Sequence, residues 1–292
     1  ANNNLLKDLF PRKISELEPD KVFILDIPIF TQELANLAKR PIFWIDHHPP
    51  IMLNKVNYYN PRIKTPEAYI PTSRMCWQVS KNPADLWIAT IGCLADWHIP
   101  DFIDEFIERY PKLIPKKTDL PTMVFKDPIS QLVKLFFFIQ KGPTKDVRKS
   151  INVLKKIKSP EEILEQTTSE GTYLWKRFSQ INKQYETLFK EAKKVVTRSK
   201  LILFYYSENQ WSFTANLANE LMARYQQKTV LIARKKGEEY KCSIRGKNIE
   251  PKLQKALENV NGRGGGHPDA CGAVINEADW DLFLAQLKEE LK

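Results

Sequence analysis

Residues 41–48 read Pro-Ile-Phe-Trp-Ile-Asp-His-His, an apolar run that ends in a carboxylate and two imidazoles. Residues 21–27 form a second apolar run, Lys-Val-Phe-Ile-Leu-Asp-Ile, and a helix-like stretch at residues 31–40 separates the two. Continuous apolar runs joined by a crossover helix are typical of parallel strands buried on both faces. The sequence therefore predicts an α/β fold in which Asp26 and Asp46 lie at the carboxyl ends of neighbouring strands.

A third apolar run, residues 86–95, leads into Asp96 and is compatible with either a strand or a buried helix. Ligands of open α/β sheets bind beyond the carboxyl ends of the strands. We therefore expect Asp26, Asp46 and Asp96 to converge on one crevice. A single loop aspartate is more often a helix cap or a turn residue, but three at strand ends favour a site.

The chain has four histidines, and three of them accompany these aspartates. His47 and His48 directly follow Asp46, and His98 lies two residues after Asp96. Mixed imidazole and carboxylate ligands suit Mn²⁺ and related divalent ions better than Ca²⁺, which prefers oxygen ligands. Two such ions activate water and stabilise the attacking and leaving oxygens of a phosphoester. The pattern therefore predicts a metal site that cleaves phosphoesters.

A glycine-rich stretch near the C-terminus is the second chemical signal. Five of the ten glycines of the chain fall between Gly262 and Gly272. Backbone N–H groups in a glycine loop that precedes a helix form an anion-binding nest. We expect a loop of this kind, with phosphate-binding candidates Arg263, Gly264, Gly265, Gly266 and His267. Arg245, at a predicted strand end, is a further phosphate candidate, although a surface arginine is an equally good interpretation.

The chain is long enough for two domains and a linker. We place a parallel-sheet domain at residues 1–128, a basic helical linker at 129–200 and a smaller α/β domain at 201–292. The linker is expected to contain helices at 129–140, 145–156 and about 172–197. The C-terminal domain is expected to contain strands at 201–206, 229–233 and 240–245 and a helix at 214–225.

Charge is concentrated in the linker. Residues 129–200 carry 16 basic and 7 acidic side chains, an excess of +9 out of a net charge of +10. A localised basic surface attracts polyanions, whereas a solvated Lys-rich helix face explains the same count without a ligand. Aromatic residues of this segment, Tyr173 among them, recur at helical spacing, which favours core packing over stacking on bases.

Composition excludes several other classes of protein. Four cysteines are scattered without a Cys-x-x-Cys pair, so neither a zinc site nor a disulfide framework is indicated, and a reducing cytoplasm fits best. No apolar run approaches the roughly 18 residues that a membrane span needs, and the first residues do not resemble a signal peptide. We therefore expect a cytoplasmic protein with no membrane partner.

Asp46-His47-His48 and Gly264-Gly265-Gly266-His267 together resemble the motifs of the DHH phosphoesterases that carry a C-terminal DHH-associated domain. The resemblance extends from about residue 21 to residue 273 and is strongest with the RecJ-type exonucleases. It implies that Asp26, His47 and Asp96 are metal ligands, that His48 acts beside the scissile phosphate and that Asp46 orients it. It also implies that His267, its neighbouring glycines and Arg245 bind the substrate phosphate.

One departure concerns the first motif of this family. That motif is an aspartate-rich strand end well upstream of Asp26, and neither Asp8 nor Asp20 stands in such a context. The missing strand belongs either to residues absent from this sequence or to a partner chain, or else the site is degenerate and binds without cutting. The other motif residues favour a strand supplied by absent residues or by a partner chain over a degenerate site, because a degenerate site has no chemical need for them.

The resemblance leaves three functions open. The first is a single-strand exonuclease on DNA or RNA that uses two Mn²⁺ ions, with Mg²⁺ as an alternative. The second is a nuclease-inactive single-strand-binding scaffold of the replication machinery, with partners such as GINS. The third is a phosphatase of small nucleotides, such as adenosine bisphosphate, nanoRNA or cyclic dinucleotides. The basic linker favours a polymeric substrate, because a mononucleotide needs one phosphate-binding site rather than an extended basic surface.

Overall fold

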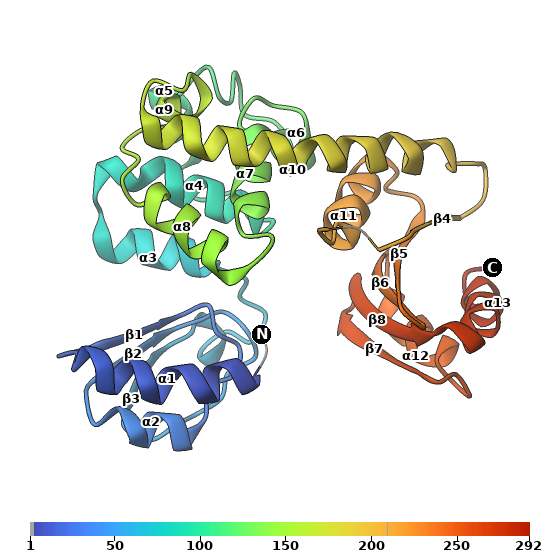
Figure 1. Cartoon of the computed structure of the whole chain (residues 1–292), viewed down its shortest axis with the longest axis horizontal. Helices are drawn as coiled ribbons and strands as arrows, with labels where there is room; N and C mark the ends of the chain where they lie inside the picture. Colours follow the sequence, from blue (N-terminus) through green and yellow to red (C-terminus); the bar gives the residue numbers. More distant parts are fainter. Residues whose placement is uncertain (1–2, 209) are drawn as a thin grey trace. The chain divides into compact units, whose positions relative to one another are not determined.

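The computed structural model describes residues 3–208 and 210–292, with the side chains of α1 described from residue 9 onward. The chain divides into two compact units, residues 1–133 and 134–292, each with its own sheet (Figure 1). The first sheet is parallel and the second is mixed, which confirms the predicted α/β class. Among the described helices, none combines the length and hydropathy that a bilayer crossing requires.

The first unit opens with a three-stranded parallel sheet of order β1-β2-β3. Its strands are β1 (Val22–Leu25), β2 (Ile42–Ile45) and β3 (Val56–Tyr59). Helices α1 (Asn3–Leu17) and α2 (Gln32–Ala38) lie against one face (Figure 1). That face buries Ile24, Phe30, Leu34, Ala35, Ala38, Ile42 and Trp44. The opposite face is largely uncovered beside β1, where Phe23 stacks on Phe43 with ring centroids 5.2 Å apart.

Helices make up the rest of the first unit. They are α3 (Thr72–Ser80), α4 (Leu86–Ala95), α5 (Ile103–Arg109) and α6 (Leu120–Phe125), and α7 (Ser130–Ile139) crosses into the second unit. The run at 86–95 is therefore a buried helix, and Asp96 is its C-cap residue. The sequence left a strand and a buried helix open for this run, and the structure has the helix, so Asp96 follows a helix rather than a strand end.

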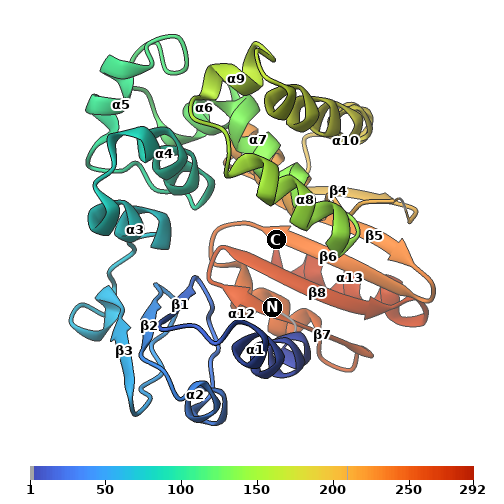
Figure 2. The same cartoon turned by 60° about the vertical axis from the view of Figure 1, so that its left-hand side comes forward.

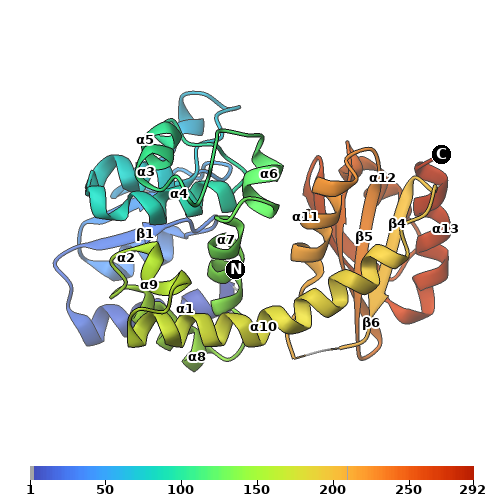
Figure 3. The same ribbon diagram turned by 90° about the horizontal axis from the view of Figure 1, so that it is seen from above.

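The second unit begins with helices α8 (Thr144–Leu154), α9 (Pro160–Leu164) and α10 (Ser169–Lys194). Figure 3 shows α10 as one continuous rod. Its N-cap Thr168 accepts a hydrogen bond from the Gly171 N–H, and Lys193 and Lys194 lie in its last turn, where they complement the helix dipole. One face of α10 is apolar and buried, including Leu174, Phe178 and Ile181.

A five-stranded sheet of order β4-β5-β6-β8-β7 completes the second unit (Figure 2). Its strands are β4 (Leu201–Tyr206), β5 (Thr229–Lys236), β6 (Glu239–Arg245), β7 (Gly262–His267) and β8 (Ala270–Asn276). Helix α11 (Thr214–Arg224) connects β4 to β5, which pair in parallel, and the remaining pairs are antiparallel. Short 3₁₀ turns occur at Pro61–Ile63, Pro83–Asp85 and Glu277–Asp279.

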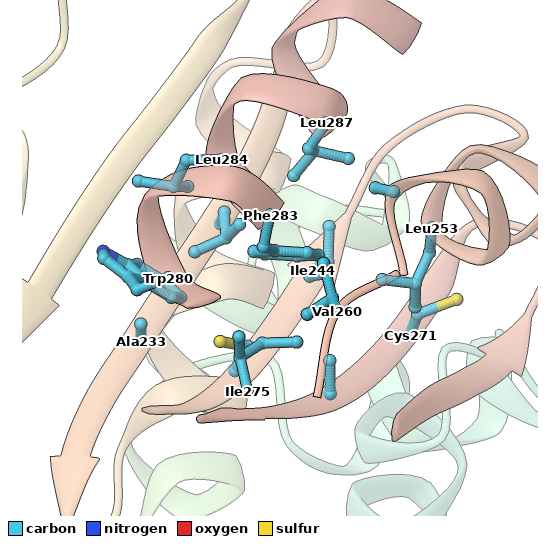
Figure 4. Packing of buried hydrophobic residues seen from close by; sticks show 14 of the residues in the cluster. Ala233, Ile244, Leu253, Val260, Cys271, Ile275, Trp280, Phe283, Leu284 and Leu287 are labelled. Carbon is cyan, nitrogen blue, oxygen red and sulfur yellow. The ribbon is translucent and has the colours of Figure 1, made fainter. Parts of the chain in front are cut away.

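Helices α12 (Ile249–Ala256) and α13 (Trp280–Glu290) cover one face of this sheet. Figure 4 shows Phe283, Leu284 and Leu287 of α13 meeting Leu253 of α12 and side chains of the strands. Trp280 stacks on Tyr240 with ring centroids 4.1 Å apart. This apolar layer holds the glycine-rich strand β7 and its neighbour β8 in place.

The glycine-rich stretch is a strand, not the predicted loop. Residues 262–267 form the edge strand β7, a turn follows, and β8 runs back antiparallel, so no helix begins there. A Cβ atom on Gly264 would lie 2.9 Å from the Ala273 Cβ and 3.2 Å from the Leu253 side chain. Glycine therefore lets β7 approach α12 closely, and the expected anion nest before a helix is corrected to a β-hairpin.

Gly171 provides a stability prediction. Replacing a helical glycine by alanine usually stabilises a protein by up to about 1 kcal/mol. Here a Cβ atom would lie 1.8 Å from the Glu162 carbonyl oxygen, where α9 meets α10. Gly171→Ala is therefore expected to destabilise the protein by about 1–3 kcal/mol in urea denaturation. Ser179→Ala, at an exposed position of α10, serves as the control and should change stability by less than about 0.5 kcal/mol; a stabilised Gly171→Ala would refute the close approach.

Candidate metal centre

The carboxyl ends of β1 and β2 bring three polar side chains together. Asp26 directly follows β1, and its left-handed backbone conformation, with φ of 58°, is one that aspartate tolerates better than most residues. His47 lies two residues after β2 and is 7% exposed. Its Nε2 atom is 3.3 Å from the Asp26 Oδ1 atom. Adjacent parallel strands therefore place a carboxylate beside an imidazole, as the sequence predicts.

Asp96 joins this cluster from the end of α4. Its Oδ2 atom lies 3.5 Å from the His47 Nε2 atom, so two carboxylates flank one imidazole nitrogen. Both carboxylates are partly open to solvent, with Asp26 at 56% and Asp96 at 41% side-chain exposure. The predicted convergence of Asp26 and Asp96 is thus present, although a helix rather than a strand delivers Asp96.

Asp46 has a different position from the other two aspartates. Its side chain is fully buried and accepts hydrogen bonds from the His48 backbone N–H at 3.2 Å and from the His48 ring through Nδ1 at 2.8 Å. The carboxylate therefore closes the turn after β2 and keeps the His48 proton on Nδ1. This leaves Nε2 of His48 available for other partners.

Three residues to which the sequence interpretation assigned no role support this arrangement. The Thr72 hydroxyl, at the start of α3, donates to Asp26 Oδ1 at 3.1 Å. Asn60 follows β3 and donates through Nδ2 to the His48 carbonyl at 2.8 Å. The Tyr69 hydroxyl donates to the Asp96 carbonyl at 2.8 Å, and its ring lies 5.4 Å from the His47 ring. Only the position of Asn60 directly after a β-rich run signals such a role in the sequence.

The electrostatics follow from these contacts. The hydrogen bond with Asp26 raises the pKa of His47, and the same bond lowers the pKa of Asp26. Burial raises the pKa of Asp96 because the charged carboxylate loses hydration. Burial also raises the pKa of Tyr69 to about 12, so this hydroxyl stays protonated at neutral pH. Two carboxylates that flank one imidazole concentrate negative charge, which attracts a cation.

The donor set suits a divalent cation. Within residues 3–208 and 210–292, one group of three or more His, Cys, Asp or Glu side chains has all its ligand atoms close together. It consists of Asp26, His47 and His48. Their ligand atoms lie within 4.8 Å of one another, and Asp96 adjoins them through His47. Imidazole nitrogen with carboxylate oxygen is a donor set that Mn²⁺ accepts. These side chains fit one ion, and the described residues offer no second group for another.

The phosphate-binding candidates lie in the second unit. Arg263, Gly265 and His267 pair with Val274, Gly272 and Ala270 of β8, and by strand alternation they share one face of the sheet. Arg263 and His267 are exposed. Both flank Gly265, at which a Cβ atom would meet no atom closer than 3.8 Å. That face therefore has two basic side chains on either side of Gly265, where the absence of a side chain leaves the backbone open.

Arg245 ends β6, as expected, but its guanidinium is engaged. Nε donates to the Asn219 Oδ1 atom at 2.7 Å, and Nη1 donates to the carbonyls of Ile244 and Cys271 at 2.8 and 3.2 Å. Burial lowers the pKa of this arginine. Arg245 therefore ties α11 to the sheet, and a phosphate has access only to the donors that these bonds leave.

Comparisons with known proteins agree with this architecture. A family model of the DHHA1 domain matches residues 199–292, and no curated protein matched the sequence. Among solved structures, RecJ in complex with Mn²⁺ from Thermus thermophilus has a TM-score of 0.64 at 15% identity. That superposition covers 96% of this chain and 46% of RecJ. The chain has the DHH fold with a C-terminal DHHA1 domain.

Two further structures share the DHH fold. The DHH domain of a protein described as a member of a family of ribosomal proteins has a TM-score of 0.62 at 15% identity, over 100% of this chain and 74% of the other. A pGpG-specific phosphodiesterase from Vibrio cholerae has a TM-score of 0.53 at 14% identity, over 93% of this chain and 98% of the enzyme. The DHH fold thus occurs here in a chain that spans about half of RecJ.

The raised pKa of His47 leads to a pH prediction. A proton on His47 competes with a cation for Nε2, and the raised pKa makes this competition begin above the ordinary value of 6.5. Mn²⁺ affinity should therefore fall as pH drops through that raised pKa, and binding should release protons. Titration calorimetry from about pH 5 to pH 9, in two buffers of different ionisation enthalpy, measures both effects. Affinity that stays constant across this range would exclude His47 as a ligand.

Proposed function

We propose that this chain is a divalent-metal-dependent phosphodiesterase that acts on single-stranded nucleic acid. The observation that carries the proposal is the Asp26, His47 and Asp96 cluster at the end of a parallel sheet. The DHH fold, which phosphoesterases use, supports hydrolysis as the reaction. The excess of basic residues in 129–200 supports a polyanionic substrate.

In the proposed mechanism, Asp26, His47 and Asp96 would hold a cation, preferably Mn²⁺ or else Mg²⁺. When bound, such an ion would make water a better nucleophile at neutral pH and would stabilise negative charge on the phosphate oxygens. His48, with its Nδ1 proton fixed by Asp46, presents Nε2 to a phosphate oxygen or a leaving oxygen. In the DHHA1 domain, Arg263 and His267 are proposed to bind a substrate phosphate through charge-assisted hydrogen bonds.

A partner strand at β1 is part of the same proposal. Among the described strands β1 pairs only with β2, so it is an edge strand with one row of free backbone groups. Phe23 and Leu25 are 60% and 44% exposed on it. Both side chains lie on the uncovered face of the sheet. On that face Phe23, together with Phe43 and Tyr59, lines a hollow of about 810 Å³. All-parallel sheets are normally covered on both faces, so another strand and helix would complete this one beside Asp26.

The proposal is tested by digestion of an end-labelled single strand with Mn²⁺, with Mg²⁺ and with EDTA, using the protein alone and together with any copurifying chain. We expect metal-dependent release of nucleotides bearing a phosphomonoester. Cleavage that persists in EDTA would refute the metal mechanism. Salt-sensitive binding without cleavage under every condition would instead favour a nuclease-inactive scaffold.

A second candidate substrate is a dinucleotide. The fold likeness to the pGpG-specific phosphodiesterase favours it, because that enzyme is matched over 98% of its length. Turnover of pGpG with no action on longer strands would select this alternative. Competition experiments, in which pGpG and an oligonucleotide are supplied together, distinguish the two substrates by the product that appears first.

A further inference from the structure

Helix α8 carries a row of cationic side chains that the proposed chemistry does not use. Between residues 141 and 158 there are seven basic residues and one acidic residue. Lys145, Arg148, Lys149 and Asn152 recur at helical spacing in α8, and side chains three and four residues apart share one helix face. Lys156 follows two residues after the end of the helix. All five are exposed, and they line an open hollow of about 480 Å³.

The negative charges nearby leave most of this row unneutralised. Asp146, the acidic residue of α8, approaches Arg177 of α10 at 3.8 Å rather than the cationic face. Glu170 of α10 pairs with Lys156 at 3.4 Å. No carboxylate among the described residues forms an ion pair with Lys145, Arg148 or Lys149. Three like charges therefore stand together, an arrangement that costs free energy unless an anion compensates it.

An aromatic ring adjoins the same row. The Lys149 ammonium lies 4.8 Å from the centre of the Tyr173 ring of α10, and that ring is only partly buried. The apolar side chains of α8 that reach solvent are few, with Ile151 at 42% exposure. A membrane-bound helix needs a broad apolar face, whereas a single strand needs phosphate contacts and a ring on which a base can stack.

We propose that this face of α8 is a binding surface for the backbone of single-stranded nucleic acid. Lys145, Arg148 and Lys149 contact successive phosphates, Asn152 adds a hydrogen-bond donor, and Tyr173 stacks on a base. From Lys145 to Asn152 the helix rises by about 10 Å, which is long enough to span successive phosphates. The inference rests on the proposed function, because it assigns a strand-holding surface to a polynucleotide-cleaving protein.

The test is a salt titration of binding to a fluorescent oligothymidine, measured by anisotropy with the whole chain in EDTA so that no cleavage occurs. The triple variant Lys145→Gln, Arg148→Gln and Lys149→Gln should weaken binding by about 10- to 100-fold at low salt. The slope of log affinity against log salt should fall by about 2, since each lost phosphate contact contributes about 0.7 for single strands.

A matched control removes the same charge elsewhere. The exposed residues Lys183, Lys190 and Lys194 of α10, changed together to Gln, should leave affinity within about twofold and the slope unchanged. Equal losses in the two variants would overturn the proposal, because net charge alone would then explain binding. Tyr173→Phe should retain affinity, while Tyr173→Ala should lose about 10-fold.

Two further outcomes separate this surface from its alternatives. The first outcome concerns other anions, either anionic vesicles or inorganic polyphosphate. If one of them binds the wild type as tightly as oligothymidine does, and if its affinity falls as much in the triple variant, the assignment to nucleic acid is overturned. Hydrolysis of a dinucleotide, which is too short to reach along α8, should be unchanged in the triple variant. Failure of the wild type and of every variant to cleave the labelled single strand with Mn²⁺ would count against the proposed function, whereas unchanged oligothymidine binding in the triple variant would count against α8.

Discussion

Replacing His47 by Ala is expected to lower metal-dependent phosphodiester hydrolysis by about 10³-fold or more. Residues that merely orient metal ligands typically cost 10- to 100-fold when removed, and loss of a ligand itself costs more. His47 occupies the central position of the cluster, because its Nε2 atom lies within 3.3 Å of Asp26 and 3.5 Å of Asp96. The measurement is kcat/KM on a labelled single strand, together with Mn²⁺ affinity.

His98→Ala is the matched control for this prediction. His98 is two residues from Asp96 but does not belong to the cluster, and burial lowers its pKa instead of raising it. We expect its loss to change the rate by less than about threefold, a small change on the scale of active-site effects. Circular dichroism establishes that both variants are folded. A His47→Ala protein with the wild-type rate and Mn²⁺ affinity would remove His47 from the metal centre.

Replacing Glu220 by Gln is expected to produce the largest loss of stability. Glu220 is 1% exposed in α11, and it accepts a hydrogen bond from the Tyr185 hydroxyl at 2.6 Å. It also pairs with Arg224 at 2.8 Å and with Lys134 at 3.1 Å. Breaking a buried ion pair leaves the partner charges uncompensated, which costs about 3–5 kcal/mol. Because Lys134 and Arg224 retain some hydration, we expect about 2–4 kcal/mol here.

Glu186→Gln tests whether burial is the cause of that loss. Glu186 also pairs with Lys134, at 3.4 Å, but its side chain is 40% exposed. We expect this change to cost less than about 1 kcal/mol in the same denaturant titration. Equal effects of the two substitutions would mean that the buried position of Glu220 does not set the energy of this cluster.

Parts of the fold that depend on side-chain periodicity were predictable from the sequence. The predicted strand at 201–206 coincides with β4, and the helices expected at 145–156 and 214–225 correspond to α8 and α11 within one or two residues. The Asp-His-His motif after β2 was also identified. In these segments large apolar side chains recur with the period of a strand or a helix, and this pattern indicates which face of the element is buried.

The errors arise where side chains carry little information. β7 is made mostly of glycine, which has no side chain to show the alternation of a strand, so the sequence suggested a loop. For α1 no prediction was made, since Pro11 inside the segment argues against a helix. The run at 86–95 is apolar on all sides, so neither period is visible, and tertiary burial decides that it is a helix.

In the candidate site, too, some residues were predictable from a local sequence pattern and others were not. Three site residues follow apolar runs that predict strands, namely Asp26, Asp46 and His47. By contrast, Thr72 comes from the start of a helix and Tyr69 from a loop. Their roles depend on contacts between segments that are 46 and 27 residues apart in the chain. A local pattern does not record such distant contacts, so these two residues emerge only from the structure.

The most direct measurement of the central claim is anomalous diffraction at the manganese edge from crystals of the protein grown with Mn²⁺. We predict a peak within bonding distance of the Asp26 carboxylate, the His47 Nε2 atom and the Asp96 carboxylate, and loss of that peak in His47→Ala. Manganese bound elsewhere, with these three side chains still joined only to one another, would contradict the assignment of this cluster as the metal centre.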